Sequence, residues 1–260
     1  MPVPVLCYHR IGGPLELGIT RVGQRVFEKQ MRALAQAGWR TLTLAEFTNT
    51  LSRSSALRTP HSALLLTLDD AYASLADFAY PLLAELGFTA TTFLITDFVG
   101  RTNTWDARYT WRRLTHLDWP AVEQWRARGF DFGSHGATHR RLTWLTASAA
   151  ADDLERSRDT LVRRLGEDAG TAVAFPFGAT NDRLARSARL AGYTLGFGGV
   201  RGDPHDRFDL PRVPVYSWDA FRVPLGLRSD GLGILGRWVA HIANRCAVGT
   251  SLLKAVSGES

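Results

Sequence analysis

The stretch Ala63-Leu64-Leu65-Leu66-Thr67-Leu68-Asp69-Asp70 is an apolar run that ends in two adjacent carboxylates. A run of roughly four to eight apolar residues closed by polar ones is typical of a buried strand in a parallel sheet. Burying a carboxylate pair costs free energy unless a cation or hydrogen bonds compensate it, although a turn or a helix cap also explains such a pair. Because adjacent side chains of a strand point to opposite faces, both carboxylates can reach one site only where the strand becomes a loop.

Further β-rich runs alternate along the chain with segments that have the apolar spacing of a helix. The runs cover residues 3–7, 40–42, 90–95, 130–133, 172–175 and 194–197. Helical spacing is found at residues 27–35, 75–86 and 154–165, and Asp118 followed by Pro120 is a typical helix start. This alternation is the pattern of βα units around a parallel sheet. We therefore expect an α/β barrel of about seven parallel strands covered by outer helices.

The composition fits one large core, because 45% of the 260 residues are apolar. The net charge of +6 is compatible with an acidic partner, but the Arg residues are scattered through helical stretches and no nucleic-acid-binding motif accompanies them. Cys7 and Cys246 are expected to be buried thiols. The sequence shows no signal peptide and no apolar stretch of about 20 residues, so we expect a cytoplasmic protein.

Two parts are expected along the chain, a barrel over residues 1–222 and a C-terminal tail over residues 223–260. Ile234 and Trp238 of the tail fall on one helical face and Arg237 on another, which predicts a basic amphipathic helix. Packing against the barrel is the expected role of this helix. Peripheral contact with an anionic membrane is the alternative. The oligomeric state is not predicted.

A second strand end is the segment Asp131-Phe132-Gly133-Ser134-His135-Gly136-Ala137-Thr138-His139. Two His residues separated by three others lie on one side of a helical turn and can present their nitrogens to one metal ion. Together with one carboxylate they form a set that leaves positions open for water and substrate. A His pair alone also serves as a cap or a core feature, but its coincidence with the carboxylate pair favours a metal site.

A third loop, Phe175-Pro176-Phe177-Gly178, follows the strand expected at residues 172–175. Pro176 fixes its own φ and Gly178 permits a tight turn, so the amide of Phe177 could face the site. An amide held in this way stabilises an oxyanion. Without the other two motifs, the segment would be an ordinary barrel loop.

In order and content, residues 67–70, 135–139 and 175–178 resemble the first three motifs of the NodB-homology polysaccharide deacetylases, carbohydrate esterase family 4. The resemblance covers about residues 1–220 and is closest to the branch that acts on the biofilm polysaccharide poly-N-acetylglucosamine. It implies a deformed (β/α) barrel and a hydrolase that removes N-acetyl groups from an N-acetylhexosamine glycan. The implied cofactor is a divalent ion, zinc above all, with cobalt or nickel as alternatives.

The resemblance also implies roles by position. Asp69 would be the catalytic base, and Asp70, His135 and His139 would be the metal ligands. The amide of Phe177 would contribute to an oxyanion site.

This sequence departs from the family at several positions. Ala71 stands where Gly is usual, and Ala174 stands where many members carry an Arg that orients the catalytic Asp. Arg212 is the candidate replacement and resembles a late Arg of the biofilm-polysaccharide branch, although a surface Arg between prolines is the alternative. The usual last-motif His is not evident. His9, after the first strand, resembles an early His of the same branch and is the candidate general acid, with His241 as its competitor.

Aromatic residues are candidates for stacking on sugar rings, with Trp105 and Trp218 foremost and core packing as the alternative. His61, His116 and His205 lack a partner motif and are expected at the surface. Two other functions stay open, namely a deacylase of a lipid-linked sugar or another amide, and a catalytically silent carbohydrate-binding relative.

Overall fold

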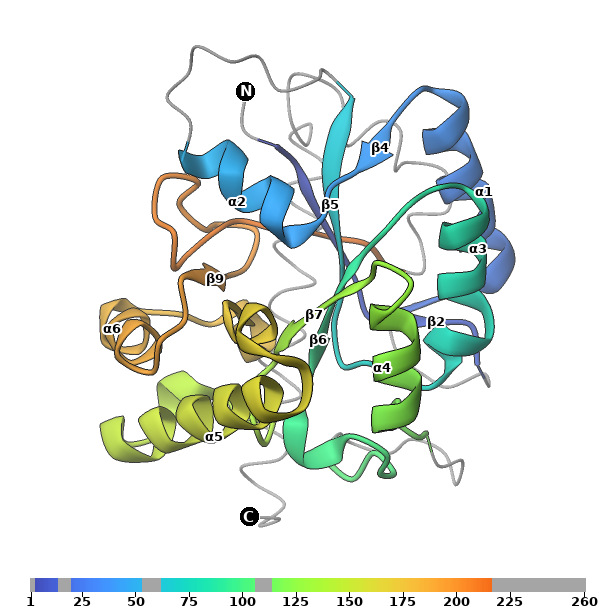
Figure 1. Ribbon diagram of the computed structural model, residues 1–260. Coiled ribbons are helices and arrows are strands. Elements are labelled where there is room, and N and C mark those ends of the chain that lie inside the picture. Colours follow the sequence, from blue (N-terminus) through green and yellow to red (C-terminus); the bar gives the residue numbers. More distant parts are fainter. Residues whose placement is uncertain (1–2, 14–19, 53–61, 106–113, 217–260) are drawn as a thin grey trace.

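The fold is taken from a computed structural model that describes residues 3–13, 20–52, 62–105 and 114–216 (Figure 1). Short strands alternate with helices through these residues. The strands are β1 (Val5–Tyr8), β2 (Arg10–Ile11), β3 (Arg21–Val22), β4 (Arg40–Thr41), β5 (Ala63–Leu68), β6 (Thr91–Leu94), β7 (Asp131–Ser134), β8 (Ala172–Ala174), β9 (Leu195–Phe197) and β10 (Val213–Pro214). The α-helices are α1 (Gln24–Gln36), α2 (Leu44–Ser52), α3 (Tyr80–Glu85), α4 (Trp119–Arg126), α5 (Ala147–Leu165) and α6 (Asp182–Leu190).

Shorter helical turns complete the described part. They are η1 (Leu75–Ala79), η2 (Thr96–Phe98), η3 (Leu142–Trp144), η4 (Glu167–Gly170) and η5 (Pro176–Gly178). None of the helices in this part of the chain is long and apolar enough to cross a bilayer.

In the described residues, seven parallel strands form the main sheet in the order β10, β1, β5, β6, β7, β8, β9, and β4 pairs with the start of β5. Each of the seven expected runs overlaps a strand, so the prediction of an α/β barrel with outer helices is confirmed. The prediction missed β10, which is only two residues long and therefore has no readable hydrophobic period.

The two ends of the sheet meet through the segment around β10. Leu210 forms a parallel bridge with Phe197 of β9, and Val213 pairs with Leu6 of β1. The amide of Arg212 also donates to the carbonyl of Gly199. The sheet is therefore curled into a deformed barrel, with Arg212 in the segment that joins its first and last strands.

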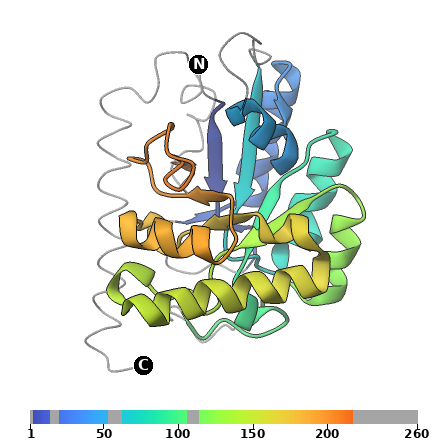
Figure 2. The same cartoon turned by 60° about the vertical axis from the view of Figure 1, so that its left-hand side comes forward.

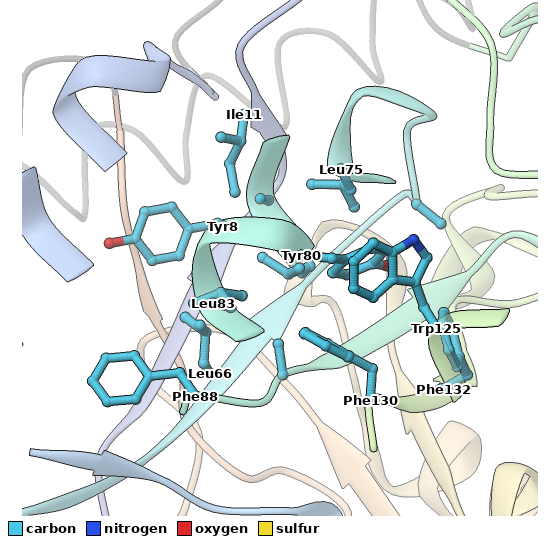
Figure 3. Packing of buried hydrophobic residues seen from close by; sticks show 14 of the residues in the cluster. Tyr8, Ile11, Leu66, Leu75, Tyr80, Leu83, Phe88, Trp125, Phe130 and Phe132 are labelled. Carbon is cyan, nitrogen blue, oxygen red and sulfur yellow. The ribbon is translucent and has the colours of Figure 1, made fainter. Parts of the chain in front are cut away.

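The strands bury both of their faces, as expected for a parallel sheet. On β5, Leu66 faces the outer helices and packs in a cluster with Tyr8 and Tyr80 (Figure 3). Leu65, the next residue, packs inside the barrel with Phe93 and other inner side chains. Burial of each such side chain contributes about 1.5–3 kcal/mol to folding.

Outer helices cover the strands on several sides (Figure 1). Helices α5 and α6 lie side by side and pack against β8 and Phe175 (Figure 2). The helix start expected at Asp118 is confirmed, because its carboxylate accepts a hydrogen bond of 2.9 Å from the amide of Ala121 at the beginning of α4.

Candidate active site and metal centre

Three strand ends deliver side chains to one point at the carboxyl end of the barrel. Cys7 pairs with Thr67, and the amide of Asp69 donates to the carbonyl of Tyr8, so the ladder between β1 and β5 continues beyond β5. Alternate residues of a strand share a face. Asp69 therefore continues the inward face of β5, and His9 continues the inward face of β1.

Asp70 reaches the same point by a different route. Its φ of 68° and the φ of 53° at Ala71 lie in the left-handed region, which turns the chain sharply after β5. Such a conformation costs a non-glycine residue about 1–3 kcal/mol and is typical of functional sites. The turn brings the second carboxylate to the face that Asp69 already occupies. It also explains physically why a glycine suits the position of Ala71.

The segment from His135 to His139 follows β7 as an irregular loop and not as a helical turn. Gly136 and His139 have φ values of 75° and 57°, which reverse the chain instead. The amide of His135 donates a hydrogen bond to the carbonyl of Leu94, so the pairing of β7 with β6 continues as far as His135. The loop still brings the two imidazoles close together, with ring centroids 4.9 Å apart.

Asp153 of α5 holds this loop in place. Its carboxylate accepts hydrogen bonds from the amides of Ala137 (2.7 Å) and Thr138 (3.2 Å) and from the Thr138 hydroxyl (2.6 Å). A Cβ on Gly136 would lie 2.7 Å from Asp153 Oδ1. Asp153 is buried, so these contacts are shielded from water. Sequence reasoning missed this residue, because it lies on a helix 14 positions away from His139 with no motif around it.

Replacing Asp153 by Asn should weaken metal binding by about 10–100-fold, as is typical for groups that orient metal ligands. The amide group of Asn would face a backbone amide and leave it unpaired. Competition with a chromophoric chelator measures the affinity. Asp152→Asn is the matched control, since Asp152 is exposed on the same helix and pairs only with Arg156 among the described residues. Equal affinities of the two variants would contradict the role of Asp153.

Asp70, His135 and His139 form a compact buried cluster. One ligand atom from each lies within 4.8 Å of the others. Asp70 Oδ1 is 3.5 Å from His135 Nε2 and 3.3 Å from His139 Nε2. Two ligand atoms about 2.1 Å from a tetrahedral zinc ion lie roughly 3.4 Å apart. The spacing of the three atoms therefore fits a small divalent cation between them.

The hydrogen bonds of the cluster also favour a cation. His135 Nδ1 donates to the carbonyl of Ala174 at 2.7 Å, so on a neutral ring Nε2 carries a lone pair that faces Asp70. Burial lowers the pKa of His135 to about 4, which keeps the ring neutral near pH 7. Asp70 Oδ1 is buried and accepts no hydrogen bond from the described residues. The Nε2 lone pair and the carboxylate oxygen repel each other, and a cation between them would turn this repulsion into two favourable contacts.

The charge states fit the same interpretation. Burial opposes ionisation of Asp70, but the neighbouring imidazoles, with His139 foremost, hold its pKa at about 2. The carboxylate is therefore ionised across the physiological range. One carboxylate and two imidazoles are the donor set that catalytic divalent metals commonly use.

Asp69 lies beside this cluster but is bound differently. Arg212 Nη1 donates to its Oδ1 at 2.6 Å, and both side chains are buried. Its Oδ2 lies 3.9 Å from His9 Nε2 and 3.8 Å from His135 Nε2. Burial opposes ionisation, but Arg212, with smaller contributions from the two imidazoles, holds the pKa of Asp69 far below its usual range. Asp69 is thus a carboxylate that stays ionised and is oriented by Arg212.

Replacing Arg212 by Met should lower the free energy of unfolding by about 3–5 kcal/mol, because it leaves the buried Asp69 carboxylate without its partner. Urea titration of the metal-free protein measures this loss. Arg40→Met breaks the exposed pair with Glu46 and should cost at most about 1 kcal/mol. A loss at Arg212 as small as that of the control would show that the pair is dispensable for stability.

Aromatic side chains line the cluster on one side. The Trp105 ring lies 3.7 Å from the His139 ring, centroid to centroid, and the Phe177 ring lies 5.0 Å from it. Phe177 has a φ of 63°, and Gly178 after it could not carry a Cβ, which would approach Gly199 Cα to 2.8 Å. The third loop is therefore a tight turn next to the cluster, as its Pro and Gly residues predict.

The expectation that His116 lies at the surface was wrong. Its ring is buried, Nδ1 donates to the carbonyl of Asp70 at 2.6 Å, and Nε2 accepts from the Trp105 indole at 3.1 Å. His116 thus ties the turn after β5 to Trp105. The sequence could not indicate this position of His116, because its partner is a main-chain carbonyl, and the pattern of side chains contains no information about such a contact.

Several predicted residues lie elsewhere. His205 is exposed, as expected, and Cys7 is buried. Trp218, His241, His61, Cys246 and the whole tail of residues 223–260 lie outside the described residues. The predictions for them stay predictions.

The structure is a parallel-stranded α/β barrel with a buried Asp-His-His cluster and an Arg-paired carboxylate at its strand ends. These are the features of a barrel hydrolase with a candidate metal centre. The family model described as "Polysaccharide deacetylase" matches residues 56–196, more than half of the chain. The chain belongs to the polysaccharide deacetylase family. The resemblance inferred from the three motifs is thereby confirmed.

Individual relatives agree with this family. The Bacillus subtilis protein YxkH, named after the same family, is 27% identical over 194 residues, which are 75% of this chain, and the chain spans 63% of its length. A poly-beta-1,6-N-acetyl-D-glucosamine N-deacetylase of Staphylococcus epidermidis is 27% identical over 226 residues, which are 81% of this chain and 73% of that protein.

Solved structures share the fold. IcaB from Ammonifex degensii superposes with a TM-score of 0.72 at 24% identity, covering 88% of this chain and 97% of that one. The Streptococcus pyogenes deacetylase PplD superposes with a TM-score of 0.71 at 21% identity, covering 82% of this chain and 92% of that one. These likenesses support the deformed barrel.

Proposed function

We propose that this protein is a metal-dependent hydrolase that removes N-acetyl groups from an N-acetylhexosamine glycan such as poly-N-acetylglucosamine. The observation that carries the proposal is the position of an ionised, Arg-paired Asp69 beside the Asp70, His135 and His139 cluster. The similarity to the Staphylococcus epidermidis N-deacetylase supports the choice of substrate.

Asp70, His135 and His139 would hold the ion, with zinc favoured by the donor set and by the spacing of the ligand atoms. When bound, the ion would acidify water and polarise the acetyl carbonyl. Cobalt or nickel would suit the same ligands.

Asp69 accepts the proton of the attacking water in this proposal. The water oxygen bonds to the acetyl carbon, and the amide of Phe177 helps to stabilise the oxyanion that forms. Arg212 keeps Asp69 ionised and oriented until the proton arrives. His9 then donates a proton to the departing nitrogen, the C–N bond breaks, and acetate and a free amine leave.

Trp105 is proposed to form one wall of the sugar site. The contact with His139 and the hydrogen bond to His116 hold the indole next to the cluster, where it would pack against a sugar ring. Trp218 remains a candidate for the same task.

The proposed function is tested by acetate release from poly-β-1,6-N-acetylglucosamine. Protein treated with a chelator should release no acetate, and activity should return when zinc is restored. Protein that binds zinc but releases no acetate from this or any other N-acetylhexosamine glycan would contradict the proposal. Release from an acylated lipid-linked sugar alone would identify the alternative substrate class.

Replacing His9 by Gln should lower acetate release from the glycan by about 10²–10⁴-fold. The amine leaving group requires a proton, whereas the phenolate of an activated aryl acetate does not. Hydrolysis of the aryl ester should therefore fall much less, and the ratio of the two rates measures the role of His9. His205→Gln, at an exposed position, is the control. Equal losses on both substrates would argue against His9 as the acid.

A further inference from the structure

Cys7, His9 and Asp69 form a second cluster of potential cation ligands, beside the candidate metal site. One ligand atom from each lies within 4.8 Å of the others. Cys7 Sγ is 3.4 Å from Asp69 Oδ2, and His9 Nε2 is 3.9 Å from the same oxygen. A thiol, an imidazole and a carboxylate together suit soft and borderline divalent ions.

The barrel holds these three groups in place. Cys7 and His9 are alternate residues that extend inward from β1, and Asp69 lies on the adjacent strand end. Arg212 occupies Oδ1 of Asp69, which leaves Oδ2 directed toward the thiol and the imidazole. The His9 side chain is 24% exposed and offers a path from solvent to the otherwise buried cluster.

The charges of the cluster select the kind of ion. A Cys7 thiolate and the Asp69 carboxylate carry two negative charges, which offset the nearby Arg212 guanidinium. Burial raises the pKa of the Cys7 thiol, so a hard cation leaves the thiol protonated. An ion with a strong preference for sulfur can displace the thiol proton to the buffer and take its place.

We propose that Cys7, His9 and Asp69 bind a thiophilic divalent cation, such as Cd²⁺ or excess Zn²⁺, and that this second ion inhibits the enzyme. The inhibition rests on the proposed function. It follows because the Asp69 oxygen and the His9 nitrogen that would move protons are then used as ligands. The binding itself depends only on the three side chains.

The experiment uses the full chain loaded with one equivalent of zinc and titrated with Cd²⁺. The ultraviolet Cd–thiolate charge-transfer band and acetate release are measured on the same samples. Asp70, His135 and His139 include no thiol, so Cd²⁺ bound there produces no such band. Since the chain has two cysteines, the Cys246→Ser variant contains Cys7 as its only thiol.

In Cys246→Ser, the band should saturate at one Cd²⁺ per chain while acetate release falls in the same proportion. Cys7→Ser should lack the band and need at least roughly tenfold more Cd²⁺ for the same fractional inhibition, measured against its own Cd-free rate. No band in Cys246→Ser would overturn the proposal, and this result does not require the Cys7 variant to fold.

Equal Cd²⁺ sensitivity of Cys7→Ser and the wild type would place the inhibitory ion elsewhere and would also overturn the proposal. Should the Cd-free protein release no acetate from any glycan, the proposed function fails. A saturating band in Cys246→Ser would still support the cation site in that case, so the two failures are distinguishable.

Discussion

Replacing Asp69 by Asn is expected to lower turnover by about 10²–10⁴-fold while the bound metal is retained. Asn keeps the shape of the side chain and an acceptor for Arg212, but it cannot take a proton from water. Asp69 contributes no ligand atom to the cluster of Asp70, His135 and His139, so metal content should be unchanged. Steady-state acetate release and metal analysis on the same preparation measure the two effects.

Asp206→Asn is a suitable control for this experiment, because the Asp206 side chain contacts Arg189 and the amide of Phe208 rather than Asp69 or the cluster residues. It should leave both turnover and metal content at wild-type values. Turnover of Asp69→Asn within a fewfold of the wild type would show that another group accepts the proton. Loss of the metal in this variant would instead make Asp69 a ligand.

Replacing His135 by Ala should abolish metal binding and turnover together. The change removes a ligand atom from the interior of the barrel. We expect the zinc affinity to fall by more than about 100-fold, which is the upper end of the losses caused by changing groups that only orient a ligand. The lone pair of Nε2 is fixed toward Asp70 by the hydrogen bond from Nδ1 to the carbonyl of Ala174, so no neighbouring group replaces it readily. Equilibrium dialysis against zinc measures the affinity.

His205→Ala is the matched control, since His205 is exposed. His135→Ala tests binding of the ion, whereas Asp69→Asn tests proton transfer to the base while the ion stays bound. A His135→Ala variant that keeps wild-type zinc affinity would contradict the assignment of the ligands.

The barrel could be predicted from the sequence because its strands bury both faces. Runs such as Ala63–Leu68 are buried along their whole length and are apolar except for Thr67, so each can be recognised without knowledge of its neighbouring strands. The strand β10 could not be found in this way, because two residues that include a proline have no period. Its pairing with β1 depends on the rest of the barrel.

The chemical types of the site residues could also be read from the sequence, but not all of their geometry. Asp70 reaches the cluster through a left-handed φ that no side-chain pattern indicates, and the loop between His135 and His139 is reversed by positive φ values rather than by a helical turn. Asp153 and His116 were missed because each is tied to the site through backbone groups, the amide of Ala137 and the carbonyl of Asp70, which no side-chain pattern reveals. Such contacts depend on tertiary structure alone.

The most direct test of the central claim is anomalous scattering at the zinc edge from a crystal of the protein loaded with one equivalent of zinc. The account predicts one strong peak about 2.0–2.2 Å from Asp70 Oδ1, His135 Nε2 and His139 Nε2, with Asp69 outside bonding distance. A structure with zinc bound elsewhere, or with these three side chains pointing apart and no peak between them, would contradict it.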